Sequence, residues 1–158
     1  MNTFTKWFLL NAVFSTGIFF AETKGAISLM VRSDISHLTI VIMTLYVLVS
    51  VMVGRLCYLA DKASKNTGKD IDERDRLSRR AEVGWFAAEH FFSLGLLGTV
   101  FGLCVATATT LNVGTEISDI VGGLKTGLNT AFYTTICGIV FSLPLQVQLM
   151  ILRFKLEE

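Results

Sequence analysis

The segment TGLNTAFYTTICGIVFSLPLQVQLMIL, residues Thr126–Leu152, contains no aspartate, glutamate, lysine or arginine. A helix needs about 20 apolar residues to cross a bilayer core that is roughly 30 Å thick, and this segment exceeds that length. Two further charge-free segments, His90–Thr115 and Ile35–Gly54, are also long enough. The sequence therefore predicts an all-α membrane protein with at least three transmembrane helices.

The composition argues against a soluble enzyme or a nucleic-acid-binding module. Of the 158 residues, 52% are hydrophobic and 17% are charged, whereas an ordinary soluble domain has about 45–50% and ~25%. Cys57, Cys104 and Cys137 each lie alone in an apolar segment, so they form neither a disulfide framework nor a zinc site. Without a nucleophile–base pair, metal cluster or phosphate-binding loop, we expect no enzyme activity, no cofactor and no nucleic-acid partner. Membrane lipid is the expected surrounding.

Residues 1–34 allow two interpretations. Trp7–Ala21 is charge-free, but as a helix it would be only about 22 Å long. It is either a short, tilted fourth span or an amphipathic helix at the outer membrane interface, with 22–33 as a connector. Cleavage after Ala21 as a signal peptide is not expected, because the −3 position needs a small residue and Phe19 would occupy it.

From Ile35 onward the charges divide the chain into four parts, which are a transmembrane helix at 35–60, a polar helical segment at 61–82, a helix pair at 83–152 and a tail at 153–158. Eight of the 14 lysines and arginines lie between Arg55 and Glu82, and two more follow the last span. The positive-inside rule places both regions, and hence the C-terminus, in the cytoplasm. Acid-first pairs four residues apart predict a helix in the second half of 61–82 that continues into the next span.

Small residues dominate the predicted helix pair. The glycines on which we expect helices to pack are Gly95, Gly98, Gly102, Gly123, Gly127 and Gly138. Small residues let helix backbones approach closely in a membrane, where no hydrophobic effect drives helices together. Packing within one chain and packing between chains both satisfy this pattern. Two spans so rich in small residues favour an oligomer.

The polar residues of the helix pair are mostly hydroxyls. They are Thr99 in the first helix and Thr130, Thr134, Thr135 and Ser142 in the second. A buried threonine often bonds the carbonyl four residues earlier in its own helix. A hydroxyl cluster on glycine-rich helices also suits a wet cavity that replaces the hydration of a cation or orders water for proton transfer. Ion paths usually carry an ionisable group inside the membrane, and this chain has none there. If the chain moves protons, another chain supplies the carboxylate.

Two segments of the helix pair resemble the paired motifs of the MotA/TolQ/ExbB channel family. They are LGLLGTVFGL (Leu94–Leu103) and LNTAFYTTICGIVFSLPL (Leu128–Leu145). The residues that carry the resemblance are Gly98, Thr99, Thr135, Gly138 and Pro144, with Arg55 ending the preceding span. The resemblance covers about residues 38–152.

The resemblance implies a homopentamer around two single-span partner helices similar to MotB, ExbD or TolR. The partner brings an aspartate beside the threonines, and ion flow drives rotation of one part against the other. The implied ion-path residues are Thr99, Thr134 and Thr135, with Thr130 and Ser142 as support. A second hydroxyl at Thr134 resembles sodium-driven members, so the ion is either H+, which we prefer, or Na+ held by the three threonines.

The sequence departs from the flagellar members, because its cytoplasmic segment 61–82 is much shorter than theirs. The phrase LKTGLNTAFYTTICG is similar to defence-system relatives, although their long C-terminal tail is absent. A compact TolQ/ExbB-like energiser of the bacterial inner membrane, delivering work to the periplasm, is the expected function. The alternatives are a non-conducting membrane scaffold and a small multidrug-type carrier, which would need its own intramembrane carboxylate.

Overall fold

The computed structural model describes residues 2–63, 71–110 and 116–157. Within these ranges the chain forms five helices, which are α1 (Thr3–Thr23), α2 (Ala26–Ser33), α3 (Leu38–Ala63), α4 (Ile71–Thr110) and α5 (Ile117–Glu157). Two predicted parts extend beyond the described ranges. Residues 64–70 of the predicted segment 61–82, and the last residue of the predicted tail 153–158, lie outside them.

Four of the described helices, α1, α3, α4 and α5, are long and apolar enough to cross a membrane. The helices α4 and α5 have 40 and 41 residues, so each is about 60 Å long, twice the hydrocarbon thickness of roughly 30 Å. The predicted continuation of the polar helix into the membrane is present, because α4 runs unbroken from Ile71 to Thr110. The chain is an all-helical, multi-pass membrane protein.

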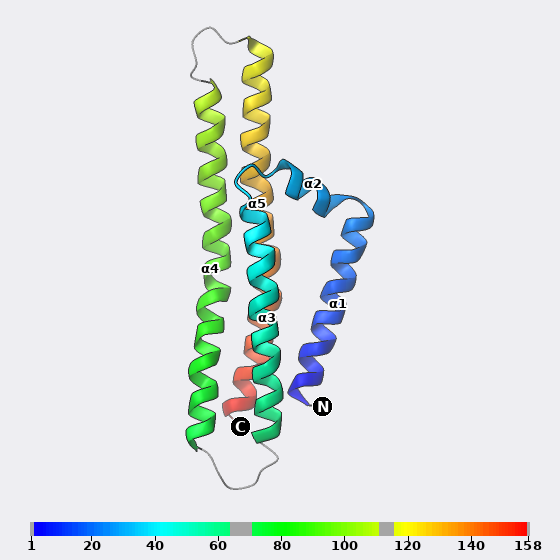
Figure 1. The fold of residues 1–158 in the computed structure, drawn as a ribbon, viewed down its shortest axis with the longest axis vertical. Helices are drawn as coiled ribbons and strands as arrows, with labels where there is room; N and C mark the ends of the chain where they lie inside the picture. The colour runs from blue at the N-terminus through cyan, green and yellow to red at the C-terminus, as the bar shows by residue number, and fades with distance from the viewer. Residues whose placement is uncertain (1, 64–70, 111–115, 158) are drawn as a thin grey trace.

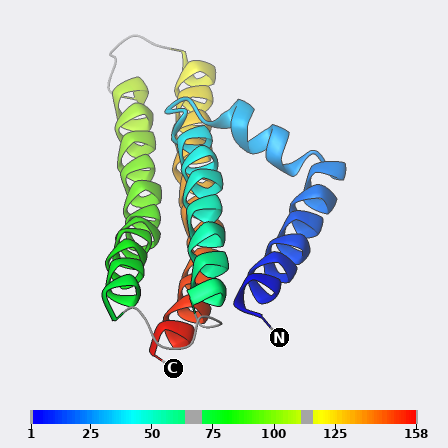
Figure 2. The ribbon, with the colours of Figure 1, turned by 60° about the horizontal axis from the view of Figure 1, so that its bottom comes forward.

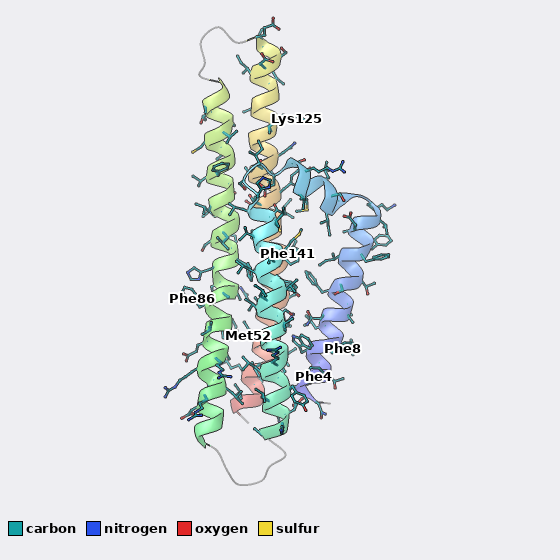
Figure 3. The ribbon with its side chains drawn as sticks, viewed as in Figure 1. Phe4, Phe8, Met52, Phe86, Lys125 and Phe141 are labelled. Atoms are coloured by element: carbon teal, nitrogen blue, oxygen red, sulfur yellow. The ribbon has the colours of Figure 1, made fainter. Side chains whose placement is uncertain are left out.

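The three longest helices, α3, α4 and α5, form the body of the molecule, and the most extensive contact joins α4 to α5 (Figure 1). Helix α1 leans against the body near the two chain termini and separates from it toward the other end, where α2 crosses back to α3 (Figures 1 and 2). Both α4 and α5 extend beyond the start of α3, and Figure 3 places Lys125 on this extension.

The position of α1 favours a fourth span over an interfacial helix. This helix lies along the body and runs opposite to α3, whereas the eight-residue α2 lies across it (Figure 1). With 21 residues, α1 is about 31 Å long. It is longer than its charge-free part because Lys6 and Glu22, near its two ends, are included in the helix. Charged side chains at such positions can reach the headgroups.

The core lies where α3, α4 and α5 meet. Its fully buried apolar side chains include Ile42, Val53, Phe91, Leu145, Leu149 and Leu152. Helix α1 joins this core through Phe14, whose ring lies 5.3 Å from Tyr46 and 5.6 Å from Phe141, centroid to centroid. Nearer the N-terminus, the Trp7 ring covers Gly54, where an added Cβ would lie 2.5 Å from the indole. A glycine is therefore required for α1 to pack this closely on α3.

Five polar side chains also bind α1 to the body, and we call them the Gln148 network. Gln148 of α5 is 0% exposed. Its Oε1 accepts from Trp7 Nε1 at 3.1 Å and from Ser50 Oγ at 3.0 Å. Its Nε2 lies 3.2 Å from Asn11 Oδ1 and 3.3 Å from Tyr46 Oη, both as acceptors. Because a bilayer core offers no water to unpaired polar groups, these groups satisfy one another.

Two carboxylates cap helix N-termini, one at α1 and the other at α3. Asp61, in the last turn of α3, accepts the backbone N–H groups of Thr3 at 3.0 Å and Phe4 at 2.8 Å. A negative charge is favourable at a helix N-terminus, where these N–H groups have no partner within the helix. Asp34 is buried and accepts the N–H of Thr39 at 2.8 Å, in the first turn of α3. This cap explains why the helix predicted at 35–60 begins at residue 38.

Candidate ion-path site

The two helices of the predicted pair touch backbone to backbone through glycines. A Cβ added to Gly102 of α4 would lie 2.4 Å from the carbonyl oxygen of Gly127 and 2.6 Å from the nitrogen of Ala131. A Cβ added to Gly127 would lie 2.4 Å from the carbonyl oxygen of Gly102. No side chain fits at either position, so the two glycines fix the shortest approach of α4 to α5 in this part of the seam.

About two to three helical turns away, the two helices again pack backbone to backbone. A Cβ on Gly95 would lie 3.3 Å from the Cα of Gly138, and one on Gly138 would lie 2.8 Å from the carbonyl oxygen of Phe91. Between these two contacts, Gly98 makes room for Thr134, whose Oγ1 would be 2.4 Å from an added Cβ. The helices are thus held together on both sides of the position where the hydroxyls lie.

These contacts change the interpretation of the glycine pattern. Five of the six predicted packing glycines, namely Gly95, Gly98, Gly102, Gly127 and Gly138, pack α4 against α5 within one chain. The sixth, Gly123, is half-buried in the N-terminal part of α5. Because α4 and α5 are consecutive antiparallel helices, the glycines of α4 meet those of α5 within one chain, and no second chain is needed. The glycines therefore give no support to an oligomer.

Two of the predicted ion-path residues lie together in this seam. The hydroxyls of Thr99 on α4 and Thr135 on α5 touch each other, and both side chains are half-buried. The carbonyl oxygen of Ala131 lies 2.9 Å from Thr135 Oγ1 and 3.3 Å from Thr99 Oγ1. The carbonyl oxygen of Gly95 lies 3.4 Å and 3.3 Å from the same two hydroxyls.

This arrangement is rich in acceptors. A hydroxyl has one donor hydrogen but two acceptor lone pairs. When one hydroxyl donates to the other and the second donates to a neighbouring carbonyl, a lone pair on each hydroxyl stays available. The Thr99–Thr135 pair can therefore accept a hydrogen bond from a protonated carboxyl group or from water, or coordinate a small cation.

Thr134, the third predicted ion-path residue, points toward Gly98 and shares one acceptor with the pair. Its side chain is 0% exposed and fills the space over Gly98. Its hydroxyl lies 3.2 Å from the carbonyl oxygen of Ala131, which the Thr99 and Thr135 hydroxyls also approach, and 2.8 Å from the carbonyl oxygen of Thr130 four residues earlier. This is the local bond that a buried threonine often makes. All three predicted hydroxyls therefore meet at the carbonyl oxygen of Ala131, with Thr134 on the buried side over Gly98 and the Thr99–Thr135 pair half-buried.

The two predicted support residues are also separate from the pair. Thr130 Oγ1 donates to the carbonyl oxygen of Ser33 at 3.1 Å and accepts the N–H of Ile35 at 3.3 Å. It therefore fastens the α2–α3 connector to α5. Ser142 Oγ donates to the carbonyl oxygen of Ala88 at 2.8 Å and is buried. This bond joins α5 to α4 and lies nearer than the Thr99–Thr135 pair to the end of the molecule that holds the chain termini.

Sequence reasoning missed the amides. Gln146 Nε2 donates to Ser142 Oγ at 3.1 Å, and Gln148 and Asn11 belong to the Gln148 network. All three lie inside segments that are recognised by their lack of charged residues, so a search for charges passes over them. A search for amides within the same segments would have found them.

No charged side chain accompanies the hydroxyl pair along the chain, because 90–115 and 126–152 hold no aspartate, glutamate, lysine or arginine. Over the ranges that the structure describes, no group of three or more His, Cys, Asp or Glu residues could hold a metal ion. The site thus consists of hydroxyls and backbone carbonyls on two glycine-packed helices.

The fold and the site together describe a multi-pass helical membrane protein whose α4–α5 seam carries hydroxyls. A family model described as the MotA/TolQ/ExbB proton channel family matches residues 60–158. This is more than half of the chain, and the chain belongs to that family. Membership implies a proton-channel role in an energiser or stator complex, and members generally work with MotB-, ExbD- or TolR-like partners. No curated protein and no solved structure matches the chain significantly.

Proposed function

We propose that this protein is the channel-forming subunit of an ion-driven rotary motor. In this proposal, five copies surround two single-span partner helices, and ion flow through the assembly is converted into mechanical work. The observation that carries the proposal is the contact between the Thr99 and Thr135 hydroxyls in the α4–α5 seam. Both residues also belong to the motifs by which the sequence resembles the family.

The chemistry of the pair fits a partner that carries an aspartate. The pair offers acceptors but no ionisable group, so it cannot itself take up a proton at neutral pH. A carboxyl group brought by the partner would bind and release the proton, and the hydroxyls would orient it. The division of labour follows from the missing intramembrane carboxylate.

Family membership supports the pentamer, whereas the glycines do not, since they are used inside the chain. The proposed location is the bacterial inner membrane with a cytoplasmic C-terminus, which rests on the lysines and arginines between residues 55 and 82. We propose H+ as the ion. Two hydroxyls with adjacent carbonyls also suit Na+, so both ions belong in the test.

Substitution of the hydroxyl pair tests the proposal. Thr135→Val and Thr99→Val keep the side-chain shape and remove one oxygen each. The complex, purified with the single-span partner encoded by a neighbouring gene, is placed in proteoliposomes that report internal pH or sodium. Each variant loses one interaction with the ion or with the partner's carboxyl group, and an interaction of this kind contributes about 1.5–3 kcal/mol. We therefore expect a roughly ten- to hundredfold slower ion flux.

Thr44→Val is the matched control, because the Thr44 hydroxyl bonds its own helix, at 2.8 Å from the carbonyl oxygen of Ile40. Thr135→Ser retains the hydroxyl and should conduct. Equal flux in Thr135→Val and wild type, with assembly intact, would refute the channel and favour a non-conducting scaffold. The driving ion is the one whose gradient the wild-type complex dissipates.

Native mass spectrometry of the gently extracted complex tests the stoichiometry. Five copies of this chain with two copies of an aspartate-bearing partner are expected. A monomer, dimer or tetramer under the same conditions contradicts the pentamer.

A further inference from the structure

A row of polar side chains leads from the hydroxyl pair toward the cytoplasmic end of α5. Thr135, Ser142, Gln146 and Arg153 follow one another at intervals of seven, four and seven residues. With about 3.6 residues per turn, these intervals keep the side chains on one face of the helix. This is the face of α5 that packs against α4, as the bond from Ser142 Oγ to the carbonyl oxygen of Ala88 shows.

The two middle members of the row are linked directly. Gln146 Nε2 donates to Ser142 Oγ at 3.1 Å. Gln146 is half-buried, whereas Gln148, two residues later, is fully buried on the opposite side of α5. The two glutamines therefore have different surroundings, one in the α4–α5 seam and the other in the Gln148 network.

The row ends at a polar cavity of about 370 Å³ between the cytoplasmic parts of α4 and α5. Asp75, Ser78, Glu82 and Trp85 of α4 line it, together with Arg153 and Leu156 of α5. Acidic and basic side chains line it, and a cavity of this volume with polar groups in its lining can hold water. The cavity lies on the side that the lysines and arginines assign to the cytoplasm.

We propose that the ion leaves the Thr99–Thr135 pair along this row and enters the cytoplasm through the cavity. Ser142 and Gln146 are the polar stations of this exit route. About 10 Å of helix separates Thr135 from Ser142. Gly138 packs on the backbone of α4 within this interval, so passage of the ion requires the two helices to separate there. The inference rests on the proposed channel function and adds to it a specific route and two residues.

The route predicts that water reaches Ser142 and Gln146 from the cytoplasm. Native cysteines are first replaced with alanine (C57A, C104A, C137A) in the full chain, expressed with its neighbouring genes in the native host. Gln146→Cys is then exposed to a membrane-impermeant, positively charged methanethiosulfonate in inverted membrane vesicles. Only a solvated thiol ionises to the reactive thiolate, so modification measures water access without depending on activity or on the identity of the ion.

Two neighbouring positions give matched controls. Gln148→Cys lies in the buried network, and Val147→Cys lies on an exposed apolar surface of α5. We expect Gln146→Cys to react about tenfold faster, or more, than either control. Ser142→Cys exchanges oxygen for sulfur and takes the place of Gln146→Cys if that variant does not accumulate. Equal or slower modification of the seam cysteines overturns the exit route.

The two proposals fail in different ways. Unchanged flux in Thr135→Val refutes the channel function. Abolished flux in Thr135→Val together with shielded seam cysteines refutes the exit route alone.

Discussion

The closest approach of α4 to α5 makes a quantitative prediction for Gly102→Ala. The new methyl group would lie 2.4 Å from the carbonyl oxygen of Gly127, whereas an ordinary contact begins near 3.4 Å. Since the opposing atoms belong to the backbone, no side-chain rotation relieves the clash, and the two helices must move apart. Overpacking of a core costs about 1–3 kcal/mol, and the better helix propensity of alanine returns about 1 kcal/mol.

Because the clash is severe, we take the overpacking cost as about 3 kcal/mol. With the gain of about 1 kcal/mol from helix propensity, Gly102→Ala should lower the free energy of unfolding by about 2 kcal/mol. Titration of mixed micelles with a denaturing detergent, followed by tryptophan fluorescence, measures this quantity. The separation of the helices should also part the Thr99 and Thr135 hydroxyls and slow ion flux in the proteoliposome assay.

Gly122→Ala is the control for this measurement. It lies on the same helix as Gly127, but an added Cβ there has no atom within 4 Å. Its stability should stay the same or rise by up to about 1 kcal/mol. If Gly102→Ala is as stable as wild type, or if Gly122→Ala is equally damaging, the glycine seam does not hold the helices together as described.

The same titration checks three further changes. Gly98→Ala should destabilise the protein because the methyl group meets Thr134 Oγ1 at 2.4 Å, and adding Thr134→Ala should restore stability; additive losses in the double variant would contradict this contact. Gln148→Leu removes four hydrogen bonds, each worth about 0.6 kcal/mol on average in a membrane. The free energy of unfolding should therefore fall by about 2 kcal/mol, and a decrease no larger than that of Gln146→Leu would refute this expectation. Asp61→Asn weakens the cap of α1 and should cost about 0.3–1 kcal/mol, which a shift of the transition midpoint will detect.

Much of the fold could be predicted because charge-free length is a strong physical constraint. Residues 126–152 must cross the bilayer or remain out of water in some other way, and the structure makes them part of α5. The N-terminal segment was harder, because Trp7–Ala21 is short and its place depends on distant partners. Trp7 and Asn11 bind Gln148, and no pattern in residues 1–34 contains that information.

The candidate site was predictable in part for a similar reason. Motif resemblance singled out Thr99 and Thr135, which touch in the structure. Thr134 carries the same chemical group one residue away, but a step of about 100° along a helix turns it from the pair toward Gly98. Composition shows which groups are present in a span, whereas the contact between two helices decides which of them face each other.

The Gln148 network also has a consequence for the order in which the protein is made. Trp7 and Asn11 leave the ribosome early, whereas their partner Gln148 follows only after α3 and α4 have been made. Until then the indole N–H of Trp7 lacks this acceptor, whereas the Asn11 amide already has partners in α1 and α3, namely the carbonyl oxygen of Trp7 and the hydroxyls of Tyr46 and Ser50. A chain interrupted before α5 leaves the Trp7 indole N–H without Gln148, its acceptor in the complete structure. The N-terminal helix therefore completes its docking only after the last helix of the chain has been made.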